Sequence, residues 1–189
     1  EVTLAGDFVI EFDIYMSSIS DSFILSENLK FVSFLRIDTD GAIRFRSGPA
    51  PSVATASGVV TPNKLTKIII SRVEGTLLAN VNGGDYAFSG AHSAPFIIDQ
   101  MLKYGDDGSN TEGILANLKI YDNGSLVRDY PINDNSSTIR DLANGQDGTI
   151  INGNADDWGL FDRQVSGDWK GNGLAVPPWD SVDQVLVTA

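Results

Sequence analysis

The sequence contains no cysteine and a single histidine, His92. Without cysteine the chain cannot form a disulfide, a thiolate zinc site or a thiol nucleophile. A Ser-His-Asp arrangement would have to use His92, and no Gly-x-Ser-x-Gly turn is present to position a serine beside it. We expect His92, in the segment SGAHSAPF, to be an exposed loop residue without a catalytic role.

Positive charge and long apolar runs are also scarce. Thirteen Lys and Arg residues against 25 Asp and Glu residues give a net charge of −12, which disfavours nucleic acid and anionic membrane surfaces as partners. No segment approaches the roughly 18 apolar residues of a membrane span, and no charged-then-apolar leader begins the sequence. The chain begins at Glu1 like the interior of a longer sequence, so we expect it to be a fragment of a larger protein.

Helical periodicity is nearly absent, whereas apolar residues recur at every second position. This spacing predicts β-strands, and only residues 136–144 could hold a turn or two of helix. The predicted strands are 8–16, 31–37, 42–47, 65–73, 76–81, 114–122, 125–130, 149–151, 158–161 and 183–187.

Short turn motifs separate several of these strands. Asn123-Gly124 and Glu74-Gly75 each predict a two-residue hairpin, and residues 38–41 predict another turn. Many short strands with regularly spaced turns predict an all-β fold, a two-sheet antiparallel β-sandwich or jelly roll with minimal helix. We expect a single domain over residues 1–189, with a Gly- and Pro-rich excursion at 163–180 and a closing strand at 181–188.

Several segments together resemble a known fold family. They are FVIEFDIYMSS with ILS at 24–26, FLRIDTDGAIRFRSG, LTKIIISRVEGTLLANVNGG and MLKYGDDGSNTEGILANLKIYDNG. In this order they resemble the concanavalin A-like, laminin-G-type jelly roll. The tail from DYPINDNSS to DDWGLF is similar to versions of that domain in phage virion and tail-fibre proteins. The resemblance covers residues 8–162 and implies a fold, while the family includes lectins, adhesion domains, hydrolases and structural decorations.

Glu11 and Asp13 lie two residues apart on a predicted strand, so both side chains should project from one face. The laminarinase-type hydrolases of the resembled superfamily carry Glu-x-Asp-x-Glu on one strand. Here the third acidic place is Tyr15, and a tyrosine with a reference pKa of about 10 is a poor proton donor for sugar cleavage. We therefore expect Glu11 and Asp13 to be solvent-facing and the chain not to be an enzyme.

Acid-rich loops raise the prospect of a calcium site. The resemblance implies Ca²⁺ in loops at one rim of the sandwich, held by carboxylate, amide and carbonyl oxygens. The loop GDDGSNTEG at 105–113 offers Asp106 and Asp107 as the best ligands. Asp38 with Asp40, and Asp156 with Asp157, are alternatives in other turns, and none of these turns has the EF-hand spacing.

Sugar recognition needs a flat apolar face for stacking, with polar groups beside it. Trp169, in SGDWKGNG, is the best candidate platform, whereas we expect Trp158 and Trp179 to serve packing. The candidate glycan-binding residues are Trp169, Asp106, Asp107 and Asn110.

The leading hypothesis is a lectin-like, non-enzymatic domain that binds a cell-surface glycan or polysaccharide for host-surface recognition. It would form part of a phage virion or surface protein, located outside the cell or on the virion. The alternative is a structural jelly roll that decorates a capsid, neck or fibre and recognises other virion proteins. Under that alternative the end of the chain, residues 181–189, could pair with a neighbouring copy and build a homo-oligomer. A polysaccharide-degrading enzyme is the third hypothesis.

Overall fold

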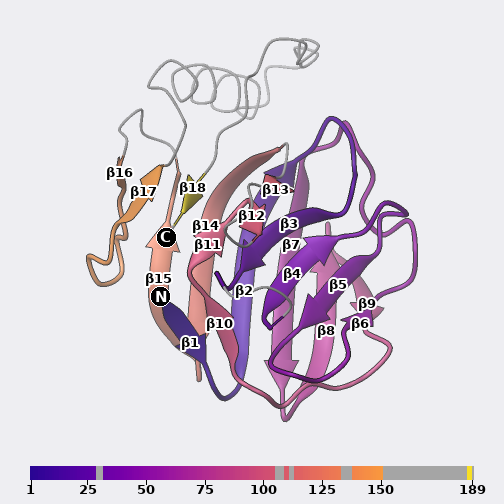
Figure 1. Ribbon diagram of the computed structural model, residues 1–189, viewed down its shortest axis with the longest axis horizontal. Coiled ribbons are helices and arrows are strands. Elements are labelled where there is room, and N and C mark those ends of the chain that lie inside the picture. The colour runs from indigo at the N-terminus through magenta and orange to yellow at the C-terminus, as the bar shows by residue number, and fades with distance from the viewer. Residues whose placement is uncertain (29–31, 105–108, 111–112, 133–137, 151–186, 189) are drawn as a thin grey trace.

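The structure, a computed structural model, describes residues 1–28, 32–104, 109–110, 113–132, 138–150 and 187–188. Within these ranges every regular element is a β-strand and every strand pairing is antiparallel. Two sheets lie face to face around one core, which confirms the predicted two-sheet β-sandwich (Figure 1). Among the described residues there is no helix of the length and apolarity that a membrane crossing requires.

One layer is a six-stranded sheet that contains Glu11 and Asp13. Its strand order is β15-β14-β2-β7-β8-β9. The strands are β2 (Phe8–Tyr15), β7 (Thr66–Val73), β8 (Thr76–Val81), β9 (Gly84–Ala87), β14 (Ile114–Asp122) and β15 (Ser125–Tyr130). The sequence predicted all of these except β9 to within one residue at each end.

Two-residue turns close the hairpins of this sheet. Glu74 and Gly75 have φ values of 49° and 79°, and Asn123 and Gly124 have values of 47° and 79°. Positive φ at both central residues is the requirement of a type I′ turn, so both predicted hairpins are confirmed. Glutamate adopts positive φ rarely, and the carboxylate of Asp7 stabilises this turn by accepting a 2.8 Å hydrogen bond from the backbone N–H of Glu74.

The other layer is an eight-stranded sheet with the order β16-β17-β18-β11-β3-β4-β5-β6. Strand β4 begins three residues later than predicted, because the chain turns at 32–33 before it enters the sheet. Two small sheets complete the fold, β1 (Val2–Leu4) with β10 (Phe96–Ile98), and β12 (Lys103–Tyr104) with β13 (Ser109–Asn110). The strands of the large sheet are β3 (Ser22–Ser26), β4 (Phe34–Ile37), β5 (Ile43–Arg46), β6 (Val53–Ala54), β11 (Gln100–Met101), β16 (Thr138–Ile139), β17 (Gly148–Ile150) and β18 (Val187–Thr188).

The core lies between the two large sheets. Alternate residues of β2, namely Phe8, Ile10, Phe12 and Ile14, are fully buried and belong to one cluster with residues of β3, β4 and β5. Burial of each such side chain contributes about 1.5–3 kcal/mol to stability. Because side chains alternate along a strand, this burial forces the polar residues of β2 onto the opposite face.

The predicted helical segment at 136–144 is wrong at Thr138–Ile139, which form β16 and pair with β17. Ile139 is buried in the core, and pairing with β17 satisfies the backbone while keeping that contact. A single turn remains at Asp141, whose carbonyl accepts a 3.2 Å bond from the N–H of Gly145. Because this short segment has little intrinsic preference for helix, its tertiary contacts decide that it forms a strand.

The end of the chain returns to the large sheet of the same molecule. Val187–Thr188 form β18 between β11 and β17, inside the predicted closing strand at 181–188. The excursion at 163–180 and the predicted strand at 158–161 lie outside the described residues. The assignment of the whole chain to one domain stays a prediction.

Candidate functional site

The outer face of the six-stranded sheet carries the polar residues of β2. Glu11 and Asp13 both point away from the core, as their spacing predicts. Neighbouring strands add lysines beside them, since Asp13 pairs in register with Lys67 of β7 and Glu11 with Lys119 of β14. Opposite charges on paired residues stabilise the sheet by about 0.2–1 kcal/mol for each pair.

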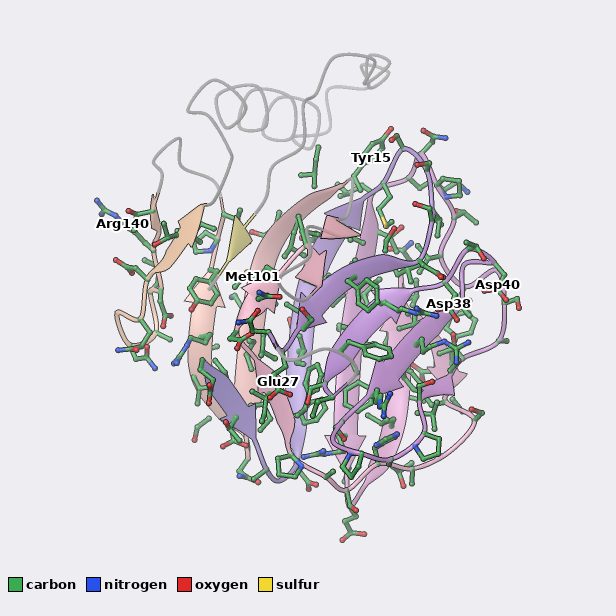
Figure 2. The ribbon with its side chains drawn as sticks, in the orientation of Figure 1. Tyr15, Glu27, Asp38, Asp40, Met101 and Arg140 are labelled. Carbon is green, nitrogen blue, oxygen red and sulfur yellow. The ribbon has the colours of Figure 1, made fainter. Side chains whose placement is uncertain are left out.

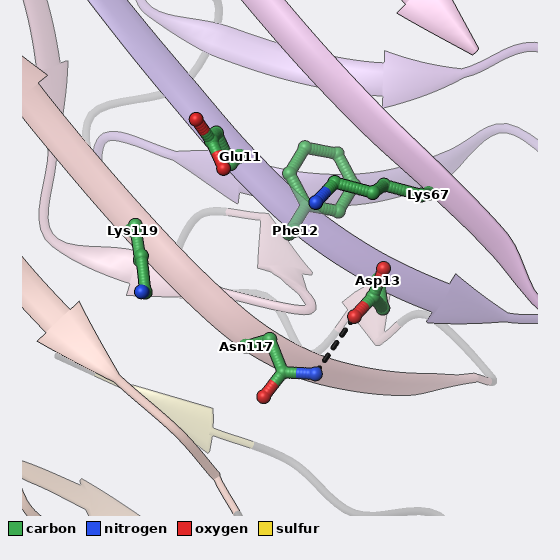
Figure 3. A pocket seen from close by; sticks show the side chains of 6 residues that line it. All are labelled: Glu11, Phe12, Asp13, Lys67, Asn117 and Lys119. Atoms are coloured by element: carbon green, nitrogen blue, oxygen red, sulfur yellow. Dashed lines mark hydrogen bonds between the residues drawn. The ribbon is translucent and has the colours of Figure 1, made fainter. Parts of the chain in front are cut away.

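These side chains border a pocket of about 240 Å³ on this face (Figure 3). Its walls come from three adjacent strands, β7, β2 and β14. The lining residues are Glu11, Phe12, Asp13, Lys67, Asn117 and Lys119.

A β-bulge brings Asn117 into the pocket. The register between β14 and β2 shifts between Ala116 and Lys119, and Asn117 has a φ of 51°. Asparagine tolerates this left-handed conformation better than most residues, and a bulge redirects the side chain that it carries. The Asn117 amide donates a 2.7 Å hydrogen bond to Asp13 Oδ2, drawn in Figure 3.

Asp13 is less accessible than the sequence suggested. Its side chain faces outward, but only 8% of the residue is exposed, so the prediction of a solvent-facing residue is wrong for Asp13. The reason is tertiary, because the bulged Asn117 covers it and holds one carboxylate oxygen. Glu11 remains partly exposed, as expected.

The two lysines are available to a ligand. In the part of the chain that the structure describes, the salt bridges involve Arg36 and Arg44 with Asp38, Arg36 with Asp21, and Arg128 with Asp141. The ammonium groups of Lys67 and Lys119 therefore keep hydrogen-bond donors for a bound molecule. Together with two carboxylates and an amide, they give the pocket both donors and acceptors.

An aromatic side chain lies next to the pocket on the same face. Tyr121 is two residues beyond Lys119 on β14 and pairs with Val9 of β2, and both residues are half-buried. A partly exposed tyrosine ring beside hydrogen-bonding groups is a suitable surface for stacking against a sugar ring. Tyr15, at the other end of β2, donates a 3.4 Å hydrogen bond from its hydroxyl to Asn63 Oδ1.

His92 is buried, which corrects the expectation of an exposed loop residue. Only 3% of it is exposed, and its ring packs edge-on against Phe45. Its Nε2 lies 2.7 Å from the carbonyl of Pro51 and therefore donates, which leaves Nδ1 to accept from the Ser47 hydroxyl at 3.1 Å. Because Ser47 is also fully buried, this pair holds the loop in place rather than facing a substrate.

The acidic residues of the 38–41 turn serve the fold. Asp38 receives 2.7 Å hydrogen bonds from both Arg36 and Arg44, and Asp40 receives one from Ser57 at 2.5 Å. These contacts use the carboxylates that the sequence offered as alternative calcium ligands. No group of three or more Asp, Glu, His or Cys residues that could hold a metal is present among the described residues.

The remaining predicted site residues are not brought into this pocket by any described contact. Trp169, Asp106, Asp107 and the pair Asp156–Asp157 lie outside the described residues. For Asn110, the structure gives only its place in β13, where it pairs in register with Lys103. Their predicted roles in glycan and calcium binding stay predictions.

Sequence reasoning missed Lys67, Asn117 and Lys119. A partial signal existed, because Lys67 and Lys119 each interrupt the apolar residues of a predicted strand with a positive charge. The missing information was which strands flank β2, and neighbours separated by over 50 residues cannot be assigned from local patterns alone.

Comparison with known proteins finds similarity in structure rather than in sequence. No protein-family model matches the chain, and no curated protein sequence matches it. Among solved structures, the chain is similar to a candidate carbohydrate-binding protein from Bacteroides ovatus ATCC 8483, with a TM-score of 0.59 and 16% sequence identity. The match covers 77% of this chain and 52% of that chain, so this chain spans about half the length of its neighbour. At this identity the likeness shows a shared fold.

Proposed function

We propose that this chain is a non-enzymatic glycan-binding domain, and that sugar binds over the pocket on the outer face of the six-stranded sheet. The observation that carries the proposal is the pocket itself, where carboxylates, ammonium groups and an amide converge beside Tyr121. The carbohydrate-binding description of the Bacteroides ovatus neighbour supports the same ligand class.

The chemistry of the pocket suits sugar hydroxyls. Each hydroxyl both donates and accepts a hydrogen bond, so a site for sugars needs both kinds of partner within a few ångströms. Glu11 can accept, Lys67 and Lys119 can donate, and Asn117 is already oriented by its bond to Asp13. An oriented amide loses little side-chain freedom on binding, which favours affinity.

The third position of the hydrolase-like motif supports a binding role. Tyr15 occupies it and uses its hydroxyl in a contact with Asn63. The only carboxylates that line the described pocket are Glu11 and Asp13, and Asp13 is held by Asn117. Retaining glycosidases need a protonated acid as well as a nucleophile, and in this chain the place of the acid in the motif is occupied by Tyr15.

The resemblance to laminin-G-type domains of phage virion and tail-fibre proteins extends the proposal. We propose host-surface recognition as the biological role, with the domain outside the cell or on a virion. A bacterial cell-surface polysaccharide would then be the physiological ligand.

An assembly role is the competing proposal, and one observation favours it. Leu78 and Val73 are exposed hydrophobic residues at the β7–β8 side of the molecule, and protein partners bury such residues. The closing strand, however, pairs within its own chain at Val187–Thr188, which does not support exchange of that strand between copies.

Binding to an immobilised panel of glycans and bacterial polysaccharides tests the proposal. The wild-type chain should bind at least one polysaccharide with a Kd in the millimolar range or tighter. Tyr121→Ala and Lys119→Ala should weaken that binding about tenfold or more, since each removes a contact worth roughly 1–2 kcal/mol.

Glu11→Gln and Glu74→Gln form a matched pair, because each removes one carboxylate charge, and Glu11 lines the pocket whereas Glu74 lies in the turn between β7 and β8. Weakened binding in the first and unchanged binding in the second would support the proposed site. Absence of binding to the whole panel would overturn the proposal and direct the search to protein partners. Release of reducing sugar from any polysaccharide would contradict the non-enzymatic assignment.

A further inference from the structure

Three buried polar atoms without hydrogen-bond partners lie at the end of β3. They are Glu27 Oε2, Ser33 Oγ and Asp99 Oδ1. Glu27 is 7% exposed and Ser33 is fully buried, so water has little access to either side chain. Buried polar groups without partners are rare because each costs about 1–3 kcal/mol, so three together require an explanation.

Backbone contacts bring the three residues together beyond the end of β3. Ser26, the last residue of β3, pairs with Gln100 on one side and Phe34 on the other. One residue further along, the N–H of Glu27 donates a 3.0 Å hydrogen bond to the Ser33 carbonyl, and the N–H of Asp99 donates a 3.1 Å hydrogen bond to the Ser26 carbonyl. Ser33 and Asp99 both lie close enough to Glu27 to influence the pKa of its carboxyl. Figure 2 shows Glu27 among the side chains at this end of the sandwich.

Among the described residues, no cationic side chain compensates the charges of Glu27 and Asp99. Burial is the main cause that raises the pKa of Glu27, and the charge of Asp99 raises it further. Burial likewise raises the pKa of Asp99, and Glu1 adds to the effect on both residues. A backbone hydrogen bond from Asn28 and the amino group of Glu1 oppose the rise in the pKa of Asp99 without cancelling it.

The Ser33 hydroxyl is close enough to lower the pKa of Glu27, yet it does not complete a hydrogen bond with an available oxygen. The Ser33 oxygen is thus a further potential metal ligand beside the two carboxylates. The neighbouring amides are already engaged, since Gln100 bonds both Ser26 Oγ at 3.3 Å and Asn28 Oδ1 at 2.9 Å. These amide bonds leave Glu27 Oε2, Ser33 Oγ and Asp99 Oδ1 without a hydrogen-bond partner.

We propose that Glu27, Asp99 and Ser33 form a calcium-binding site. Two carboxylates and a hydroxyl supply only oxygen ligands, which Ca²⁺ prefers, whereas zinc would require imidazole or thiolate. Water completes the usual six to eight ligands, and with only two carboxylates the Kd falls on the order of 10⁻⁴–10⁻³ M. The cation removes the repulsion between the acids and supplies partners for all three atoms. The site is separate from the proposed glycan pocket and does not depend on it.

Calcium titration of the full chain, followed by the thermal unfolding midpoint and by calorimetry, tests the site. Ca²⁺ at ten times its Kd should raise the wild-type Tm by ~3–6 °C in a saturable manner. Glu27→Gln and Asp99→Asn should lose this rise, while each variant should fold because it removes an uncompensated buried charge. Glu74→Gln, an exposed acid in the β7–β8 turn, serves as the matched control and should respond like the wild type.

A double variant, Asp106→Asn with Asp107→Asn, separates this site from the loop site predicted at 105–113. Retention of the Tm rise in the double variant and its loss in Glu27→Gln would support the proposal. The reverse pattern, an equal rise in all variants, or no rise in the wild type at about 10 mM Ca²⁺, well above the expected Kd, would overturn it.

Discussion

Two pairs of acidic side chains in this molecule contrast in their surroundings. Glu11 and Asp13 lie on an open sheet face, where Lys67 and Lys119 oppose them and Asn117 holds Asp13. Glu27 follows β3 and Asp99 precedes β11, and the side-chain donor that acts on Glu27 is the Ser33 hydroxyl. The difference teaches that two pairs of acids in one fold can suit different ligands. The pair Glu11 and Asp13, with cations beside it, suits a polar molecule with hydroxyls, whereas the pair Glu27 and Asp99 suits a cation.

Asp38 provides an internal reference for this comparison. Like Glu27 it is 7% exposed, but its two oxygens accept hydrogen bonds from Arg36 and Arg44. Asp38 is thus a buried carboxylate whose charge is balanced by two arginine side chains, as expected for a structural role. Because no described arginine or lysine plays this part for Glu27 Oε2, the contrast between the two carboxylates is informative.

The largest expected effect separates Asp38 from Glu27. Asp38→Asn leaves two partly buried arginines without their counter-charge and should lower the free energy of unfolding by about 2–3 kcal/mol. Glu27→Gln removes a charge that has no partner, so in calcium-free buffer we expect no loss of stability. Urea denaturation of both variants measures the two effects. Equal losses of unfolding free energy in Asp38→Asn and Glu27→Gln would contradict the contrast between the two carboxylates.

A smaller effect should appear in the pH dependence of stability. Above the raised pKa values of Glu27 and Asp99, both the folded and unfolded states are ionised and the folded state bears the burial penalty. As the pH falls through those values, the folded state binds protons first, so its stability rises. In calcium-free buffer the wild type should therefore gain stability relative to the Glu27→Gln, Asp99→Asn double variant as the pH falls from neutral toward the ordinary carboxyl pKa values of about 4. Parallel curves for the two proteins, measured by chemical denaturation, would argue against an uncompensated pair.

The smallest expected effect concerns the open face. Lys119 pairs with Glu11 on one side and Asp129 on the other, so Lys119→Gln leaves two acids without their shared cation. We expect a loss of about 0.5–1 kcal/mol at low salt, and a smaller loss at about 1 M salt, where screening is strong. Denaturation at the two salt concentrations measures this, and a loss that does not depend on salt would show that Lys119 acts through packing.

Much of the fold was predictable because local rules act strongly in this chain. Alternation along residues 8–15 placed Phe12 inside and Glu11 outside, and the dipeptide Asn123-Gly124 was sufficient to predict a hairpin. The candidate site was predictable only in part. Glu11 and Asp13 were found, but the pocket depends on a bulge at Asn117 and on two lysines from distant segments.

The sequence by itself determined the β-sandwich class, the main strands and the face on which the polar residues of β2 lie, because these follow from a two-residue repeat and from turn chemistry. Only the tertiary structure decided which strands are neighbours. Those long-range pairings bring Asn117 to Asp13, bury His92 against Phe45, and bring Asp99 and Ser33 near Glu27. Pairings of this kind depend on the packing of the whole core, so no local pattern encodes them.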